Sequence, residues 1–339
     1  MSVTIDDISR QLGISVSTVS KALNDYPDVS QETRERVKAA ALALDYHPSS
    51  AARNLRRGRS DKIGLLINNP ISFISEYISE IMAGAALSAE NYNQNLILYT
   101  TAVDHPDRLK RICRAREVDG LMLIFQPSDE AVAVLEKEGM PFIVFGRRIE
   151  HPNVSYIAPD NQDGSYRLTT HLIEQGHQRI GFTTRPQLGT VSEDRFAGYR
   201  QALDEAGIPF DPNLIIETVI EPLSGRRAFE ALLKLSDPPT ALFALYDLMA
   251  VDAAQAAQER GMIIPDDIAI AGFDSWRASL MTTPAITTVQ QPLQNMSQMA
   301  TDMLLRRIQD NSHPPERHTL PVQLIVRAST KRKIHANNN

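Results

Sequence analysis

The segment that decides the first part of the fold reads Thr4-Ile-Asp-Asp-Ile-Ser-Arg-Gln-Leu-Gly-Ile-Ser-Val-Ser-Thr-Val-Ser-Lys-Ala-Leu-Asn24. Thr4, with Asp7 three residues later, is typical of a helix N-cap, because these side chains can satisfy free N–H groups of a first turn. Gly13 can adopt the positive φ that ends a helix and turns the chain. Apolar residues repeat between these signals at helical spacing, at Ile5, Ile8 and Leu12. The segment therefore predicts a short amphipathic helix followed by a tight turn.

Two more helices are predicted after this turn. Ser15 is a suitable cap for the second helix and Ser30 for the third. The apolar positions expected to face inward are Val19, Ala22 and Leu23, followed by Val37, Ala40, Ala41 and Leu44. Two short helices joined by a glycine turn, with a third in support, are typical of a compact DNA-reading unit. Periodicity alone leaves open a small helical bundle that does not bind DNA.

The outward positions of the second helix favour DNA binding. Its N-terminal end is the part that enters the major groove. Lys21 can donate to guanine acceptors, Ser17 can donate or accept, and Val16 can touch a thymine methyl group. Small polar residues suited to phosphate oxygens surround them, at Ser15, Thr18, Ser20 and Asn24.

A basic segment follows these helices, between Pro48 and Gly58. Four arginines fall within seven residues, at Arg53, Arg56, Arg57 and Arg59. Leu55 lies among them in a helix too short to be stable alone, where it could act as an apolar wedge in the minor groove. Residues 1–60 carry a net charge of +2 and the remainder −8, which suggests that only the first part meets a polyanion. A solvated basic linker and a chance imbalance of charge are the alternatives.

This part of the chain resembles the lac repressor (LacI/GalR) family of bacterial transcription regulators. The resemblance rests on the segment from Thr4 to Asn24 and on its continuation in Val29-Ser-Gln-Glu-Thr-Arg-Glu-Arg-Val37, Tyr46-His-Pro48 to Leu55, and Ile63-Gly-Leu-Leu66. It implies a homodimer on double-stranded operator DNA, with paired hinge helices in the minor groove of a palindromic site. By this resemblance, Val16, Ser17 and Lys21 read bases. The hinge residues expected on DNA are Ala52, Arg53, Leu55 and Arg56.

The rest of the chain alternates strand-like and helical segments. Apolar runs occur at residues 63–67, 96–99, 121–125, 142–145, 180–183, 214–219, 241–246, 268–273 and 323–326. Helical patterns lie between most of them, for example at 75–90, 165–174, 195–205, 225–235 and 248–259. This alternation predicts an α/β fold with parallel sheets, and about 270 residues favour two lobes over one sheet. Ligands of such folds bind outside the carboxyl ends of the strands, which predicts a site between the lobes.

The family resemblance continues through this body, for example in Ile157-Ala-Pro-Asp160, Arg195-Phe-Ala-Gly-Tyr199 and Ala271-Gly-Phe-Asp274. It implies a body like a periplasmic sugar-binding protein, with two doubly wound lobes and crossovers near residues 161, 291 and 321. The expected divisions are a helix-turn-helix domain at 1–46, a hinge helix and linker at 47–60, and a two-lobed effector-binding and dimerisation domain at 61–330. Lobe 1 would hold about 61–160 and 292–320, lobe 2 about 161–291 and 321–330, and 331–339 would form a tail.

Three charged residues are candidates for binding an effector between the lobes. Asp160, Arg195 and Asp274 each follow a strand or start a helix, and carboxylates with a guanidinium can bind vicinal hydroxyls in pairs. The candidate apolar faces for a sugar ring are Phe73, Ile74 and Trp276. The alternatives are that the two aspartates cap helices, that Arg195 bridges the lobes, and that Trp276 is a packing or dimer-surface residue.

Three departures from the family pattern touch the expected pocket. Tyr246 replaces a small polar amide that many members carry, and favours a smaller ligand or one with a ring to stack. Ser275 stands where an acid often follows Asp274, and two residues separate Asn69-Pro70 from Phe73. Because each departure touches the expected pocket, the effector cannot be carried over from any relative. A sugar is the first expectation, with a nucleoside, a purine or a phosphorylated sugar as alternatives.

Other classes of protein find little support. The sequence has no G-x-S-x-G, P-loop or H-E-x-x-H motif and no metal-ligand spacing among its histidines, so we expect no enzyme, metal or cofactor. The single cysteine, Cys113, excludes an internal disulfide and fits the cytoplasm. No signal peptide and no apolar run of about 18 residues is evident, which argues against a membrane protein and against a sugar-transport protein with an unrelated head. The sequence predicts an effector-controlled, DNA-binding repressor.

Overall fold

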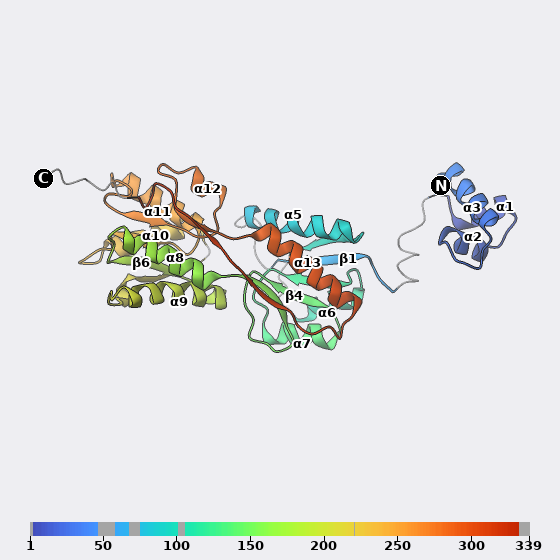
Figure 1. Ribbon diagram of the computed structural model, residues 1–339, viewed down its shortest axis with the longest axis horizontal. Helices are drawn as coiled ribbons and strands as arrows, with labels where there is room; N and C mark the ends of the chain where they lie inside the picture. Colours follow the sequence, from blue (N-terminus) through green and yellow to red (C-terminus); the bar gives the residue numbers. More distant parts are fainter. Residues whose placement is uncertain (1–2, 47–57, 68–74, 101–105, 220, 332–339) are drawn as a thin grey trace. The chain divides into compact units, whose positions relative to one another are not determined.

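The computed structural model describes residues 3–46, 58–67, 75–100, 106–219 and 221–331. The chain divides into two compact units, Met1–Ser60 and Asp61–Asn339 (Figure 1). Each unit has its own buried apolar core. The hinge residues that the sequence places between 47 and 57 lie outside the described residues.

The first unit is a three-helix domain with the predicted caps. Its helices are α1 (Ile5–Leu12), α2 (Val16–Leu23) and α3 (Gln31–Ala43). The Asp7 carboxylate accepts from the backbone N–H of Thr4 at 2.9 Å, and Gly13 ends α1 with a φ of +64°. The hydroxyl oxygens of Ser15 and Ser30 accept backbone N–H bonds in the first turns of α2 and α3. Between the helices lies a core that contains Ile8, Val19, Ala22, Val29, Val37, Ala40 and Ala41.

The second unit begins with a parallel six-stranded sheet in the order β11-β5-β4-β3-β1-β2. Its strands are β1 (Lys62–Leu66), β2 (Asn95–Tyr99), β3 (Gly120–Leu123), β4 (Phe142–Phe145), β5 (Ser155–Pro159) and β11 (Arg317–Leu320). One apolar cluster joins the sheet to α5 (Ser75–Asn91) and α13 (Leu293–Gln309), and another joins it to α6 (Pro106–Ala115) and α7 (Asp129–Lys137). Helices therefore cover both faces, which explains the nearly continuous apolar runs of the central strands. We call this part lobe 1.

The other part, lobe 2, is built on a parallel four-stranded sheet in the order β7-β6-β8-β9. Its strands are β6 (Ile180–Thr184), β7 (Ile215–Glu217), β8 (Ala241–Phe243) and β9 (Ala269–Ala271), with an antiparallel pair β10 (Thr288–Gln290) and β12 (Gln323–Ile325) beside them. Its helices are α8 (Asn161–Glu174), α9 (Thr190–Glu205), α10 (Ser224–Leu233), α11 (Asp247–Glu259) and the short α12 (Arg277–Leu280), with 3-10 turns at η2 (Pro186–Leu188) and η3 (Pro212–Leu214). The chain passes between the lobes after β5, returns after β10 and passes again after β11 (Figure 1).

Several strands differ from the expected runs. Residues 241–246 and 268–273 were expected as whole strands, but β8 and β9 end after three residues each. The last residues of both runs leave the ladder and form loops at the carboxyl edge of the sheet. Strands β5, β10 and β11 carry no continuous apolar run, because they are short, contain a proline or alternate with polar residues at an edge.

Two helix pairs pack so closely that only glycine fits at the contact. A Cβ atom on Gly84 of α5 would lie 2.4 Å from the carbonyl oxygen of Gln294 in α13, and one on Gly198 of α9 would lie 2.2 Å from that of Gln162 in α8. Any larger residue would push the helices apart, at a cost of about 1–3 kcal/mol for an overpacked core. These contacts fix the positions of α5 and α9, which both carry pocket residues.

A fully buried carboxylate, Asp247, ties three segments of lobe 2 together. It lies at the start of α11 and accepts from the Thr288 hydroxyl at 2.6 Å and from the backbone N–H of Trp276 at 2.7 Å. Burial raises the pKa of Asp247 to about 7, although these hydrogen bonds oppose the rise. The residue therefore anchors the loop after β9 and changes its protonation state near neutral pH.

This pKa predicts a pH dependence of stability. Between an unfolded-state pKa of about 4 and the folded-state value, the folded protein holds a proton that the unfolded chain has lost, so this residue's contribution falls as pH rises. Asp247→Asn removes that dependence. We expect the free energy of unfolding of the wild type, minus that of the variant, to decrease from pH 5 to pH 7, by at most about 1.4 kcal/mol per pH unit. Urea titrations at each pH measure it, and parallel curves would contradict the shifted pKa.

Candidate functional site

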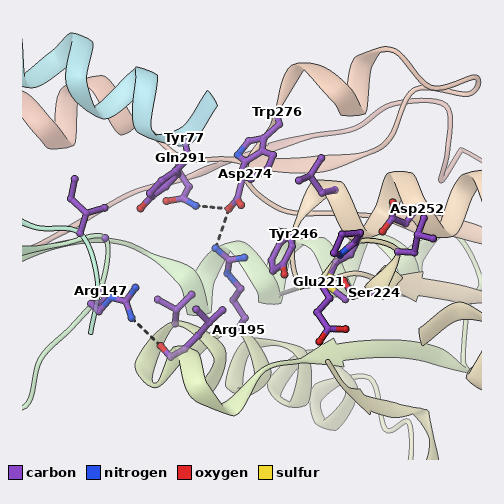
Figure 2. Close-up of a pocket in the computed structure, with 18 residues that line it drawn as sticks. Tyr77, Arg147, Arg195, Glu221, Ser224, Tyr246, Asp252, Asp274, Trp276 and Gln291 are labelled. Atoms are coloured by element: carbon purple, nitrogen blue, oxygen red, sulfur yellow. Dashed lines mark hydrogen bonds and ion pairs between the residues drawn. The ribbon is translucent and has the colours of Figure 1, made fainter. Parts of the chain in front are cut away.

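A cavity of about 320 Å³ lies between the lobes of the second unit. Its lining comes almost entirely from segments that follow strands, as expected at the carboxyl edges of parallel sheets. Lobe 1 contributes α5 and the segments after β3 and β4, and lobe 2 contributes α9 and the segments after β6, β7, β8 and β9 (Figure 2). The polar and aromatic lining residues are Tyr77, Arg147, Arg195, Glu221, Ser224, Tyr246, Asp252, Asp274, Trp276 and Gln291.

Arg195 is held in place on every side of its guanidinium group. Its Nη2 lies 3.2 Å from Asp274 Oδ1, its Nε donates to Asn161 Oδ1 at 2.9 Å, and its Nη1 donates to the carbonyl oxygen of Leu245. The guanidinium carbon lies 3.6 Å from the centroid of the Phe273 ring. Only 4% of the side chain is exposed. Arg195 is therefore a rigid donor whose orientation is set before any ligand arrives.

Asp274 completes this pair from the loop after β9. Gln291 Nε2 donates to Oδ1 at 2.5 Å, and this is the same oxygen that faces Arg195. Burial raises the pKa of Asp274, whereas Arg195 and Gln291 lower it. Asp274 and Ser275 both have positive φ values, +103° and +60°. Such backbone strain is typical of functional loops that the surrounding structure holds in place.

Two aromatic residues carry buried polar groups that no other described residue satisfies. The indole N–H of Trp276 and the hydroxyl of Tyr246 are buried and make no hydrogen bond to any residue that the structure describes. Burial raises the pKa of Tyr246 to about 12, so its hydroxyl stays protonated and able to donate. A buried donor without a partner costs about 1–3 kcal/mol. Both groups line the pocket, where a ligand's acceptor atoms could satisfy them.

The structure brings together four of the predicted effector residues, Arg195, Tyr246, Asp274 and Trp276, in one pocket. Asp160 is placed differently, because its carboxylate accepts the backbone N–H of Asp163 at 2.9 Å and caps α8. Asp160 is absent from the lining of the pocket, as the helix-cap alternative predicts. The other two candidates, Phe73 and Ile74, lie outside the described residues.

Sequence reasoning missed Tyr77, Arg147 and Gln291, which all line the pocket. Arg147 follows β4 by two residues, so the rule that ligands bind beyond strand ends could have identified it. Tyr77 lies on α5 and Gln291 follows β10, a strand that the sequence pattern does not reveal. The sequence pattern therefore gives no comparable signal for Tyr77 or Gln291.

The lobes are also bridged directly by residues adjacent in sequence to those that line the pocket. Arg148 of lobe 1 makes two hydrogen bonds with Asp194 of α9, at 3.0 and 2.7 Å. Glu76 of α5 accepts from the backbone N–H of Arg277 in α12 at 2.9 Å. The lobes therefore contact each other directly as well as through the residues that line the pocket.

The candidate DNA-reading residues lie on and around α2. Val16 and Ser17 are exposed in its first turn. Ser15 and Asn24 are engaged at the helix ends, because Ser15 accepts from Thr18 N and Asn24 donates to the Ser20 carbonyl oxygen. Lys21 forms an ion pair with Asp28 and would have to exchange this partner to reach a base. The hinge candidates Ala52, Arg53, Leu55 and Arg56 lie outside the described residues.

Two features are absent from the described ranges. No helix there is long and apolar enough to cross a membrane. No group of three or more histidine, cysteine, aspartate or glutamate side chains there could hold a metal ion.

Comparison with protein families matches both units. Residues 4–49 match the model of bacterial regulatory proteins of the lacI family, and residues 169–330 match a periplasmic binding protein-like domain. A ribose operon repressor from Haemophilus influenzae is 34% identical over 91% of this chain and 92% of its own length. The transcriptional repressor PurR from Aliivibrio salmonicida is 30% identical over 96% of this chain and 98% of its own length.

Solved structures agree with these relatives. A lac repressor dimer bound to operator and the anti-inducer ONPF superposes with a TM-score of 0.85 at 26% identity, covering 98% of this chain and 100% of that one. A complex of the transcriptional regulator CelR with cellobiose gives a TM-score of 0.75 at 29% identity, covering 96% of this chain and 99% of that one. These relatives are DNA-binding transcriptional regulators and not enzymes. Because the identity extends over nearly the whole chain and both units match, the protein belongs to the lacI family of bacterial transcriptional regulators.

Proposed function

We propose that this regulator is a cytoplasmic repressor that binds operator DNA as a homodimer, and that a small polyol of the sugar class controls its operator affinity from the pocket between the lobes. The observation that carries the proposal is the pairing of Arg195 with Asp274 beside two buried donors, on Tyr246 and Trp276, that have no hydrogen-bond partner among the described residues. Fixed charges and unsatisfied donors in one pocket favour a ligand rich in oxygen atoms.

The chemistry of a sugar suits each part of this arrangement. A carboxylate and a guanidinium held side by side can bind two neighbouring hydroxyl groups. The indole of Trp276, only 7% exposed, offers a flat apolar face for a pyranose or furanose ring. A regulator of this family from Enterococcus faecium, 28% identical with a TM-score of 0.70, was solved with bound ribose. The cellobiose complex of CelR is a second relative with a sugar.

The position of the pocket gives the ligand a way to act on DNA binding. Tyr77 and Arg147 come from lobe 1, whereas Arg195 and Asp274 come from lobe 2. A ligand that contacts both lobes stabilises the arrangement of the lobes in which it can make all these contacts. It shifts the equilibrium between this arrangement and others by the difference in its affinity for them. Operator affinity then depends on the ligand through the arrangement of the lobes.

Exposed apolar side chains support the homodimer. Met82 and Leu87 on α5 are 37% and 54% exposed, and Met281 after α12 is 83% exposed. Large apolar side chains are costly in water, and a second copy of the chain would cover them in a two-fold interface. A dimer also presents two α2 helices to the two half-sites of a palindrome. We assign phosphate and minor-groove contacts to Arg53, Leu55 and Arg56, and a place beside them to Ala52.

The DNA-reading surface yields a test with a matched control. We assign Lys21 to a base, so Lys21→Ala should relax the preference at one position of each half-site, a loss of about 1–3 kcal/mol of discrimination. Lys38 is the control, because it also pairs with an aspartate, Asp25, at 2.6 Å, but lies on α3. Binding-site selection on both variants measures the preference. If Lys21→Ala lowers the affinity for all DNA sequences equally, Lys21 contacts a phosphate and not a base.

The pocket is tested through Trp276, the only tryptophan in the chain. Thermal shift with a panel of sugars and nucleosides identifies a ligand, which is then titrated while tryptophan emission is followed. We expect a saturable change in emission with the same midpoint as the gain in stability, because a ligand that packs on the indole or accepts from its N–H changes the surroundings of the ring. Asp274→Asn should move both midpoints together to higher concentration. A ligand that stabilises the protein without changing the emission would place the site elsewhere.

A further inference from the structure

Most charged side chains of the pocket have an opposite charge beside them. Arg195 faces Asp274 at 3.2 Å, and Glu221 faces Arg227 at 2.9 Å. Burial raises the pKa of Asp252, and the nearby charges of Arg226 and Arg227 oppose that rise. A neutral polyol would leave these paired charges satisfied.

Arg147 is different. Its Nη1 donates to the carbonyl oxygen of Leu188 at 3.3 Å, while its Nε is buried without a hydrogen-bond partner in the described part of the chain. It forms no ion pair with any carboxylate of the described residues. The adjacent Arg148, in contrast, is paired with Asp194 at 2.7 Å.

A second arginine adds to the positive charge near Arg147. Arg185 follows β6, and its Nη1 is likewise buried with no partner among the residues described. The two guanidinium groups are close enough for the charge of Arg185 to lower the pKa of Arg147, in addition to the larger effect of burial. Figure 2 shows Arg147 and Arg195 entering the pocket from different sides. The pocket wall at Arg147, with Arg185 nearby, therefore carries positive charge that forms no ion pair with any carboxylate of the described residues.

A buried charge without a partner is costly, and an anionic ligand group removes that cost. The planar guanidinium fork matches the oxygens of a phosphate or a carboxylate. We propose that the effector is an anionic polyol, whose hydroxyl groups bind Arg195 and Asp274 and whose phosphate or carboxylate binds Arg147. This proposal rests on the effector pocket proposed above. Neutral sugars are then weak ligands of this regulator.

The test compares neutral and anionic members of matched pairs on the full-length protein. Isothermal titration and thermal shift are run with glucose, glucose 6-phosphate and glucuronate, and with ribose and ribose 5-phosphate. At least one anionic compound should bind about tenfold or more tightly than its neutral counterpart, the scale of a hydrogen bond to a charged group. The phosphate and carboxylate arms identify which anion the site takes.

Variants then assign the effect to Arg147. Arg147→Gln should weaken binding of the anionic ligand by about tenfold to a hundredfold and leave a neutral sugar within about threefold. Arg148→Gln changes the net charge equally but removes a cation that Asp194 already neutralises, so the preference for the anion should persist. Arg147→Lys keeps the positive charge but lacks the planar guanidinium group, so its affinity for the anionic ligand should lie between those of Arg147→Gln and the wild type. An intermediate affinity also shows that the loss in Arg147→Gln does not come from misfolding.

Two results would overturn the inference: equal binding of the neutral and anionic members, or equal loss of anion affinity in Arg147→Gln and Arg148→Gln. The affinity for operator DNA, measured in the presence of each compound, distinguishes a failure of the anionic effector from a failure of the proposed function. Neutral sugars that bind and change operator affinity, with no advantage for the anions, contradict only the anionic effector. If no compound binds, both proposals fail.

Discussion

The ion pair between Arg195 and Asp274 is the contact on which the ligand-binding part of the structure depends. Arg195 joins its own helix α9 to the start of α8 through Asn161, to the segment after β8 through the Leu245 carbonyl, and to the loop after β9 through Asp274. Burying two charges costs several kcal/mol each before their attraction is counted, and removing one partner of such a pair costs about 3–5 kcal/mol. An apolar pair could hold the same helices and strands. Ligand binding therefore accounts for the presence of two buried charges at this position.

The supporting contacts extend this logic to the neighbouring loop. Asp274 and Ser275 have strained φ values, and Asp247 holds the next residue through the backbone N–H of Trp276. This hydrogen bond holds the backbone of Trp276 in place, so the indole stays beside the pocket although its N–H has no hydrogen-bond partner among the described residues. Buried side chains, backbone strain and an indole N–H without a hydrogen-bond partner among the described residues all occur within this short loop. Together they describe a site whose geometry is set by the fold and completed by a ligand.

Sequence reasoning worked best where the physics is local. The caps at Thr4, Ser15 and Ser30 and the glycine turn at Gly13 act within a few residues, so the pattern predicts α1, α2 and α3 closely. It worked less well where one pattern fits two roles. An aspartate after a strand can cap the next helix or bind a ligand, and Asp160 takes the first role while Asp274 lies in the pocket. Tyr77 and Gln291 meet only through tertiary structure, since they lie on segments more than 200 residues apart. Likewise, no local pattern could show that Arg148 pairs with Asp194 whereas Arg147 forms no ion pair with any carboxylate of the described residues.

The central claim is that a ligand in the pocket of Arg195 and Asp274 controls binding to DNA, and one measurement addresses it directly. The affinity of the full-length protein for its operator is measured across a range of effector concentration, for the wild type and for Asp274→Asn. The account predicts that the effector shifts the operator affinity of the wild type, with the midpoint found by direct ligand titration. In Asp274→Asn, whose operator affinity without effector should be close to that of the wild type, the same shift should need a much higher effector concentration. An effector response that is identical in the two proteins would contradict the account.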